Sequence, residues 1–587
     1  MEVEWKLFDS EMTEIIDSLS SFCTHFKDVD PADDSTSIEV EKFDENKLLW
    51  PSLRQLVLKT PKYVNPVIPN EVPKTENPIL ALDEFQIQTS LKNNIRKAGA
   101  ALIPEGSTTP LQLEMLSIIN QYKDLYYTER NFDNGEQIRL VYCLHVLDHV
   151  LKTRSIIMAN NASITSKFDV PDEMRDQGVV RPSVLILAPF KDSAFKIINM
   201  MSTMMFPNQK GNVINRKRFQ DEFTGEEITV SQKSSRPDDF SKTFAGNIDD
   251  NFKIGISITK KSLKLYTDFY HCDIIIASPL GLRMVIGSEG ESEYDYDFLS
   301  SIEVLILDQA DVFLMQNWDH VLHIMDHVNL QPRKSHDTDF SRVRYWAANG
   351  WSKYYRQNLI FCSHPSLQIS ALVSRKCHNY AGCARTANPV ARGTISQVVV
   401  SIPHIFHRLT DTSAVKTADE RFEVFTQKLL PQCQDNLKKG VLIYVPSYFD
   451  FIRLRNYFIS EAISFADICE YTKDKKVAEA RDMFFHSEVN YLLYSERFHF
   501  FMRRRVRGIR HLIFYQLPTF PHFYSELCNL MNDANKRIKT EEDICSSITG
   551  IYSKFDAPQL ASIVSSDRAA QMLASKKDVH MIMVEST

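Results

Sequence analysis

Val304-Leu305-Ile306-Leu307-Asp308-Gln309-Ala310-Asp311 is the stretch from which the fold class follows. Its leading apolar residues predict a strand that is buried on both faces, which is typical of a parallel sheet covered by helices. Two carboxylates, Asp308 and Asp311, come directly after that strand. Proteins that transfer phosphoryl groups hold magnesium with acidic residues at such strand ends. An ordinary strand end with a polar turn is the alternative for this stretch alone, so the surrounding sequence must decide between the two interpretations.

The same pattern recurs along the chain. Short apolar runs that end in a turn residue occur at 184–189, 273–279 and 358–363, and a second series occurs at 441–446, 491–495 and 511–515. Runs of this kind, separated by helical stretches, predict parallel strands that alternate with helices. We therefore predict an α/β protein with two tandem parallel-sheet domains. The first spans residues 76–390, and the second spans residues 391–587 and ends in a helical tail.

Two segments differ from the rest in composition. Residues 1–75 are acidic and punctuated by prolines, which predicts a largely flexible N-terminal extension with one amphipathic helix near residues 12–26. Residues 205–252 are polar and charged without an obvious core, and they predict a partly mobile insert in the first domain. The acidic character of the extension comes mainly from Asp28, Asp30, Asp33, Asp34, Glu39, Glu41, Asp44 and Glu45.

The bulk composition is that of a globular protein, because 43% of the 587 residues are hydrophobic and 24% are charged. No apolar run approaches the roughly 20 residues of a membrane-spanning helix, so we expect no membrane partner. The ten cysteines include no Cys-x-x-Cys pair. Their scatter predicts free thiols in a reducing compartment, the cytosol or nucleus, and no metal site.

Motifs at the predicted strand ends occur in the order found in superfamily 2 RNA helicases. Thr109-Pro110-Leu111-Gln112 resembles their Thr-Pro-x-Gln motif, whose glutamine reads adenine. The segments 188–194 and 278–281 lie where these helicases have backbone-contact loops for single-stranded RNA. The resemblance implies two RecA-like domains, with Gln112, Asp308, Gln309 and Asp311 at the positions of the nucleotide-site motifs.

The departures from those helicases predict that the nucleotide site is a relic. In DEAD-box helicases the acid after the first Asp orients the attacking water, and here that position is Gln309, which cannot take a proton at neutral pH. No lysine lies between Lys123 and Lys152, where a phosphate-binding loop should supply one. Residues 523–530 contain no arginine that would cover the γ-phosphate. We therefore predict no catalytic residue, no cofactor and no metal.

One strongly basic stretch lies in the second domain. Arginine forks match the geometry of phosphates, and neighbouring aromatic rings are able to stack on bases, so we predict that this stretch contacts RNA. A helix face whose arginines are solvated or paired with acids is the alternative. The stretch contains Arg503, Arg504, Arg505, Arg507 and Arg510, and the neighbouring rings are those of Phe498, Phe500 and Phe501.

Four further blocks, at 297–303, 315–320, 496–500 and 507–511, narrow the resemblance to one family. They look like those of the digestive organ expansion factor family, which are degenerate DEAD-box-like proteins associated with U3 small nucleolar RNA. The resemblance covers residues 80–555. It implies a protein of the nucleus and nucleolus, without helicase activity of its own.

The family resemblance also implies a place in the small-subunit processome, in the early cleavages of the precursor to 18S ribosomal RNA. The implied partners are pre-ribosomal RNA, the U3 small nucleolar ribonucleoprotein and other processome proteins. Two alternatives stay open. The first is an active ATP-dependent RNA helicase with a divergent nucleotide loop, and the second is a module that binds only proteins, with the former RNA cleft filled.

Overall fold

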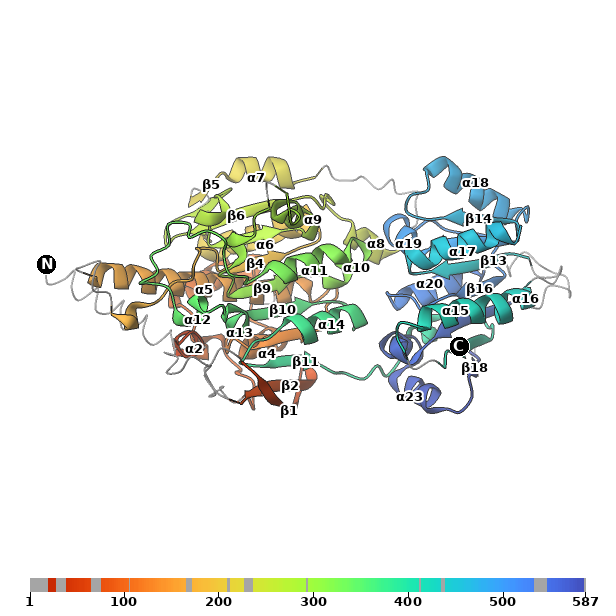
Figure 1. Cartoon of the computed structure of the whole chain (residues 1–587), viewed down its shortest axis with the longest axis horizontal. Helices are drawn as coiled ribbons and strands as arrows, with labels where there is room; N and C mark the ends of the chain where they lie inside the picture. Colours follow the sequence, from red (N-terminus) through yellow and green to blue (C-terminus); the bar gives the residue numbers. More distant parts are fainter. Residues whose placement is uncertain are drawn as a thin grey trace. The chain divides into compact units, whose positions relative to one another are not determined.

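The computed structural model describes residues 20–27, 38–64, 75–104, 106–164, 171–207, 212–225, 236–291, 294–410, 413–433, 439–532 and 546–584. The chain divides into two compact units (Figure 1). The first unit comprises Met1–Ser363 and Ile369–Asn388. The second unit comprises His364–Gln368 and Pro389–Thr587.

Parallel strands form the centre of the first sheet. In order across the sheet they are β11 (Cys383–Thr386), β3 (Asp124–Tyr127), β10 (Gln357–Phe361), β9 (Val304–Leu307), β4 (Val184–Leu187) and β8 (Ile274–Ala277). β9 pairs with β10 on one side and with β4 on the other. All of its residues are buried, as its apolar sequence predicts for a central strand of a parallel sheet.

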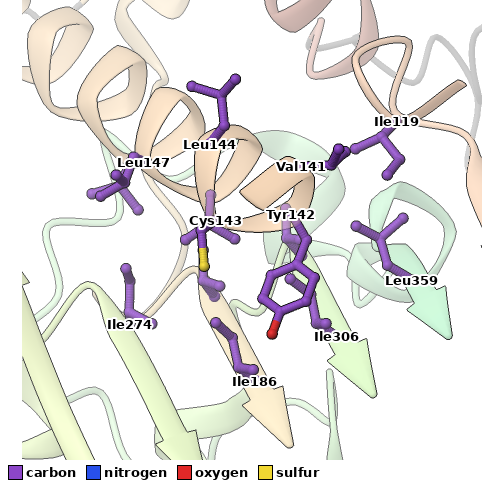
Figure 2. Close-up of a cluster of buried hydrophobic side chains, with 14 of the residues drawn as sticks. Ile119, Val141, Tyr142, Cys143, Leu144, Leu147, Ile186, Ile274, Ile306 and Leu359 are labelled. Atoms are coloured by element: carbon purple, nitrogen blue, oxygen red, sulfur yellow. The ribbon is translucent and has the colours of Figure 1, made fainter. Parts of the chain in front are cut away.

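Helices cover both faces of this sheet, and alternate residues of β9 face the two layers. Val304 and Ile306 belong to the core on one side, which includes α4 (Pro110–Ile119), α5 (Gly135–Ser163) and α6 (Lys191–Met205). Leu305 and Leu307 belong to the core on the other side, with α9 (Pro279–Ile286), α10 (Ala310–Met315), α11 (Trp318–His327) and α14 (Leu367–Lys376). Figure 2 shows α5 lying over the strands, with Tyr142 and Cys143 directed toward them.

Two described segments of the predicted flexible extension are packed, and the first, α2 (Ser20–His25), lies within the range 12–26 where a helix is predicted. The rings of Phe22 and Phe26 are buried in the core of the first unit. The ring centroid of Phe22 lies 6.0 Å from that of Tyr122 and 5.5 Å from that of His149. Residues 1–19, 28–37 and 65–74 lie outside the described part of the chain.

The second segment is a hairpin of β1 (Val40–Trp50) and β2 (Arg54–Tyr63), in which β2 pairs antiparallel with β11. Leu56 and Leu58 of β2 are buried, whereas most of β1 is exposed. Glu41, Asp44 and Glu45 therefore lie on an exposed edge strand, which is a common place for charge in a folded sheet. Composition concealed this strand because its charges protect an edge and do not signal disorder.

The described parts of the insert at 205–252 are also packed, unlike the mobile loop that its polarity predicts. In α7 (Arg216–Phe223), Phe219 and Phe223 are buried. Their ring centroids lie 5.6 Å from Phe195 and 5.7 Å from Phe252, respectively. Spacing of four residues places both rings on one helix face, so two aromatic residues anchor an otherwise polar helix. Residues 208–211 and 226–235 lie outside the described part.

The second unit is built around another set of parallel strands. In order they are β14 (Phe465–Ile468), β15 (Tyr491–Ser495), β13 (Val441–Val445), β16 (His511–Phe514), β17 (Ser547–Tyr552) and β12 (His404–Arg408). α17 (Tyr448–Ser460) packs on one face through Phe451, Leu454 and Phe458. The predicted α/β class with parallel strands in two sheets is thus confirmed.

The end of the second unit differs from the predicted helical tail. Two helices are present, α22 (Ala557–Val564) and α23 (Ser566–Ala574), but a strand follows them. This strand, β18 (Val579–Ile582), pairs antiparallel with β12 and becomes the edge of the sheet. No helix in the described ranges has both the length and the apolar character that a membrane crossing requires.

Candidate functional site

Asp308, the first residue after β9, is the centre of a buried network of ionic and hydrogen bonds. Arg130 donates through Nε to Asp308 Oδ1 at 2.7 Å, and its Nη2 lies 3.5 Å from Oδ2. The Tyr142 hydroxyl donates to Asp308 Oδ2 at 3.1 Å. Arg139 adds a second cation, with Nη2 3.7 Å from Oδ2. Both oxygens of this carboxylate are therefore engaged by the protein itself.

The two partners on α5 keep a fixed protonation state. Burial raises the pKa of the Tyr142 phenol well above its usual value, so the hydroxyl remains a neutral donor. Burial would lower the pKa of the Arg139 guanidinium, but its acidic neighbours, including Asp308, raise it. Arg139 also pairs with Glu136 in the first turn of α5. The network thus joins the end of β9 to the start of α5.

The loop between β3 and α5 lies where a phosphate-binding loop would be. The Asn131 side chain accepts hydrogen bonds from the backbone N–H groups of Asp133 and Asn134, both at 2.9 Å. The Asn134 side chain accepts from the backbone N–H of Asn131 at 2.7 Å. Phosphate-binding loops use free backbone N–H groups of this kind. Here these three groups are bonded within the loop.

Gly135 begins α5 and is the one glycine of this loop. A Cβ atom at this position would lie 3.3 Å from Nη2 of Arg130, closer than most real Cβ contacts. The glycine therefore makes room for the Arg130 guanidinium on its way to Asp308. Its presence is explained by packing against an internal cation and needs no bound phosphate.

The two other positions after β9 are also engaged by neighbouring side chains. Gln309 has a left-handed backbone conformation, with φ 56° and ψ 47°, and its Oε1 accepts a hydrogen bond from the Ser193 hydroxyl at 2.9 Å. Asp311 accepts from the Ser363 hydroxyl at 2.8 Å and from the Ser363 backbone N–H at 3.3 Å. Among the described residues, no three His, Cys, Asp or Glu side chains gather as they would around a metal ion.

Gln112 has a structural role in its own helix. Its Oε1 accepts from the Thr109 backbone N–H at 2.9 Å, and its backbone N–H donates to Thr109 Oγ1 at 3.3 Å. Together with Pro110 at the first helical position, this is a capping box at the start of α4. Helix capping therefore accounts for the Thr-Pro-x-Gln sequence. Gln112 is also largely buried.

The structure separates Arg503 from the other predicted RNA-contacting residues. Arg503 follows α19 (Glu496–Met502) in a left-handed conformation, and its side chain is buried. Its Nη1 donates to Glu526 at 2.6 Å, and its guanidinium lies 4.4 Å from the ring centroid of Phe523. We therefore remove Arg503 from the RNA-contacting set, because its buried guanidinium is already paired with Glu526.

The other arginines are spread along the segment after α19. Arg504, Arg505 and Arg507 are exposed, while Arg510 is half-buried and lies beside Gly440, just before β13. The rings of Phe498 and Phe500, predicted to be available for stacking, are instead buried. They point into the fold because α19 packs on the sheet with its aromatic face. Phe501 is half-buried.

Sequence reasoning missed Arg130, Arg139 and Tyr142. It tested the region between Lys123 and Lys152 for lysine, the cation of a phosphate loop, and passed over the two arginines. Arg139 and Tyr142 are three residues apart on α5, so they share a helix face. Two arginines in the segment where a phosphate-binding loop is expected are the signal that the sequence offers, although it does not identify Asp308 as their partner.

A second buried acid lies in the other unit. Glu496, at the start of α19, accepts hydrogen bonds from the Thr519 backbone N–H at 2.7 Å and from the Thr519 hydroxyl at 2.9 Å. Burial raises the pKa of this carboxyl to about 7, although these hydrogen bonds oppose the shift. Glu496 thus ties the end of β15 to the loop that follows β16.

We expect Asp308→Asn to lower the free energy of unfolding of the first unit by about 3–5 kcal/mol, because it leaves Arg130 buried without its counter-charge. All five tryptophans lie within residues 1–351, so their fluorescence in a urea titration reports on this unit. As a control, Glu129→Gln removes an exposed pair with Arg54 and should cost less than about 1 kcal/mol. Equal effects of the two substitutions would contradict the account.

We expect Glu496 to make the second unit less stable as the pH rises. Its folded-state pKa of about 7 is above its ordinary value of 4.5, so its contribution is complete below pH 4.5 and is lost through pH 7. The loss amounts to roughly 3 kcal/mol at 1.36 kcal/mol per pKa unit. Hydrogen exchange in peptides covering 491–530 should show this pH dependence, and Glu496→Gln should reduce it. An unchanged pH dependence in the variant would show that another group is responsible.

Comparison with known proteins identifies two matching domains. The family described as UTP25, NTP hydrolase-like domain, matches residues 122–384. The family described as Utp25, C-terminal domain, matches residues 394–582. Among solved structures, the yeast DEAD-box splicing factor Prp28 is 14% identical with a TM-score of 0.31, over 86% of this chain and 92% of that chain.

Several curated relatives align over most of their length. The U3 small nucleolar RNA-associated protein 25 homolog of Xenopus tropicalis is 47% identical over 543 residues, which are 91% of this chain and 70% of the relative. The Homo sapiens homolog is 46% identical over 86% of this chain and 67% of its own length. The protein of Schizosaccharomyces japonicus is 39% identical over 84% of this chain and 75% of its own length. These matches confirm the predicted resemblance, and the chain belongs to the UTP25 family of U3 small nucleolar RNA-associated proteins.

Proposed function

We propose that this chain is a catalytically inactive, helicase-like scaffold of the small-subunit processome. In this role it binds RNA and partner proteins during early processing of the precursor to 18S ribosomal RNA. The observation that carries the proposal is the network at Asp308, where two arginines and a tyrosine occupy the carboxylate that would hold magnesium in a helicase. With both oxygens of Asp308 engaged and three N–H groups of the loop bonded within it, these described residues do not offer a metal–nucleotide complex its usual contacts.

The family supports the proposed partners and location. Relatives in Xenopus tropicalis, Homo sapiens and Schizosaccharomyces japonicus are named for association with U3 small nucleolar RNA. These names support the U3 small nucleolar ribonucleoprotein, pre-ribosomal RNA and other processome proteins as partners. They equally support a location in the nucleus and nucleolus. An assembly factor without turnover acts through the contacts that it makes.

RNA contact is assigned to the exposed arginines of the second unit. Arg504, Arg505 and Arg507 project from an irregular segment that follows α19. Arg504 lies 4.0 Å from Asp474, a long and exposed pair that leaves the guanidinium accessible to phosphate. Arginine recognises phosphate oxygens with its planar set of donors. We therefore reduce the five arginines predicted from the sequence to these three as candidate phosphate contacts. Arg510, which is half-buried, is a weaker candidate.

We expect no ATP hydrolysis above background, with or without RNA, and Gln309→Glu should not restore it. Restoring the acid supplies a group that orients water, but it leaves Asp308 occupied and the loop closed. A coupled phosphate-release assay on the full chain measures this. RNA-stimulated turnover near 1 s⁻¹, the low end for phosphoryl-transfer enzymes such as kinases, would favour the alternative, an active helicase with a divergent nucleotide loop.

We expect the triple variant Arg504→Gln, Arg505→Gln and Arg507→Gln to bind single-stranded RNA with a weaker dependence on salt. The slope of log affinity against log salt should fall by roughly 2, at about 0.7 per phosphate contact. Fluorescence anisotropy with labelled oligouridine at several salt concentrations measures the slope. Arg568→Gln, an exposed arginine on α23, is the matched control. An unchanged slope in the folded triple variant would assign these arginines to protein contacts.

A further inference from the structure

Exposed aromatic side chains lie close behind the carboxyl ends of two strands of the second sheet. Phe449 is 87% exposed and Tyr471 is 67% exposed. Phe449 lies in the first turn of α17, which follows β13, and Tyr471 follows β14. β13 and β14 both run parallel to β15, which lies between them, so their carboxyl ends meet at the same edge. The side chains after these strand ends therefore share one surface.

The rings at this edge are held by contacts within the fold. The ring centroid of Tyr448 lies 5.2 Å from that of Tyr471, with the ring planes at 71°. Tyr448 in turn lies against Phe451, which is buried in the core, at 6.4 Å with nearly parallel planes. Tyr471 is thus placed by packing and still presents most of its ring to solvent. Phe449, the residue after Tyr448 on α17, is even more exposed, which is costly for an apolar ring.

Exposed lysines follow Tyr471 and continue toward the proposed RNA contacts. Tyr471 lies just before α18 (Asp474–Phe485), and Lys473, Lys475 and Lys476 at the start of this helix are exposed. Asp474 lies 4.0 Å from Arg504. The start of α18 therefore connects the aromatic edge to the exposed arginines, all within the second unit.

We infer that Tyr448, Phe449 and Tyr471 form a base-stacking surface for single-stranded RNA, whose phosphates lie along the lysines of α18 and Arg504. This inference rests on the RNA binding proposed above and adds that the bases of the RNA are recognised by stacking. Aromatic rings beside a cationic track are the arrangement by which proteins bind single strands, because every base offers a face for stacking.

The inference is tested on the full chain with a short fluorescein-labelled oligouridine and with an abasic oligomer of the same length. Phe449→Ala and Tyr471→Ala should each weaken binding of oligouridine by about tenfold, the typical effect of losing one stacked base. The salt slope should stay at its wild-type value, because stacking releases no counterions. On the abasic oligomer, the variants and the wild type should bind equally.

Two control variants separate stacking from a general loss of apolar surface. Tyr471→Phe keeps the ring and should bind as the wild type does. Ile459→Ala removes a non-aromatic side chain of α17 that is 57% exposed, and it should also have no effect. The melting temperature measured by circular dichroism should be unchanged in all variants, because each replaced side chain is largely exposed.

The outcomes distinguish this inference from the function on which it rests. If the wild type binds oligouridine and both alanine variants bind within twofold of it, the stacking surface is refuted and these rings serve a protein partner. If the alanine variants lose affinity equally on the abasic oligomer, the rings act on the backbone and the inference is also refuted. If the wild type binds neither oligomer, RNA binding itself fails and the inference falls with it.

Discussion

The ion pair between Arg130 and Asp308 is the constraint on which the first unit depends. Asp308 is fully buried at the end of a central strand, and an uncompensated carboxylate there would be strongly destabilising. In a helicase, magnesium and its nucleotide offset such a charge. Here Arg130, with Arg139 and Tyr142 on α5, supplies the compensation from within the chain. The closed loop at Asn131 and the room left at Gly135 are consistent with this arrangement.

The parts of the fold that depend on local pattern could be predicted from the sequence. Apolar runs such as 304–307 identify strands buried on both faces, and the placement of Asp308, Gln309 and Asp311 close behind β9 follows from one such run. The partner of Asp308 could not be predicted in the same way. Arg130 is 178 residues away in sequence, and the two meet only because β3 and β9 lie in one sheet. Strand order is a tertiary property that no local pattern contains.

Composition misled where a few apolar residues anchor a polar segment. Phe219 and Phe223 suffice to fix α7 in the insert, and Leu56 and Leu58 fix the N-terminal hairpin. The arginine cluster has the opposite problem, because sequence shows charge but not burial. Arg503 is buried and paired with Glu526, whereas Arg504, one residue later, is exposed. The left-handed turn at Arg503 sends neighbouring side chains in different directions, and this turn has no sequence signal such as glycine.

The most direct test of the central claim is whether magnesium–ATP stabilises the first unit. A ligand that binds only the folded state raises its stability by RT ln(1 + [L]/Kd), which is about 2.7 kcal/mol at a hundredfold excess over Kd. Thermal unfolding of the full chain, followed by tryptophan fluorescence with millimolar magnesium–ATP, measures this effect. We expect an unchanged melting temperature, because both oxygens of Asp308 are already engaged. A rise of several degrees that is abolished by chelating the magnesium would contradict it, because Asp308 would then be free to hold a metal–nucleotide complex.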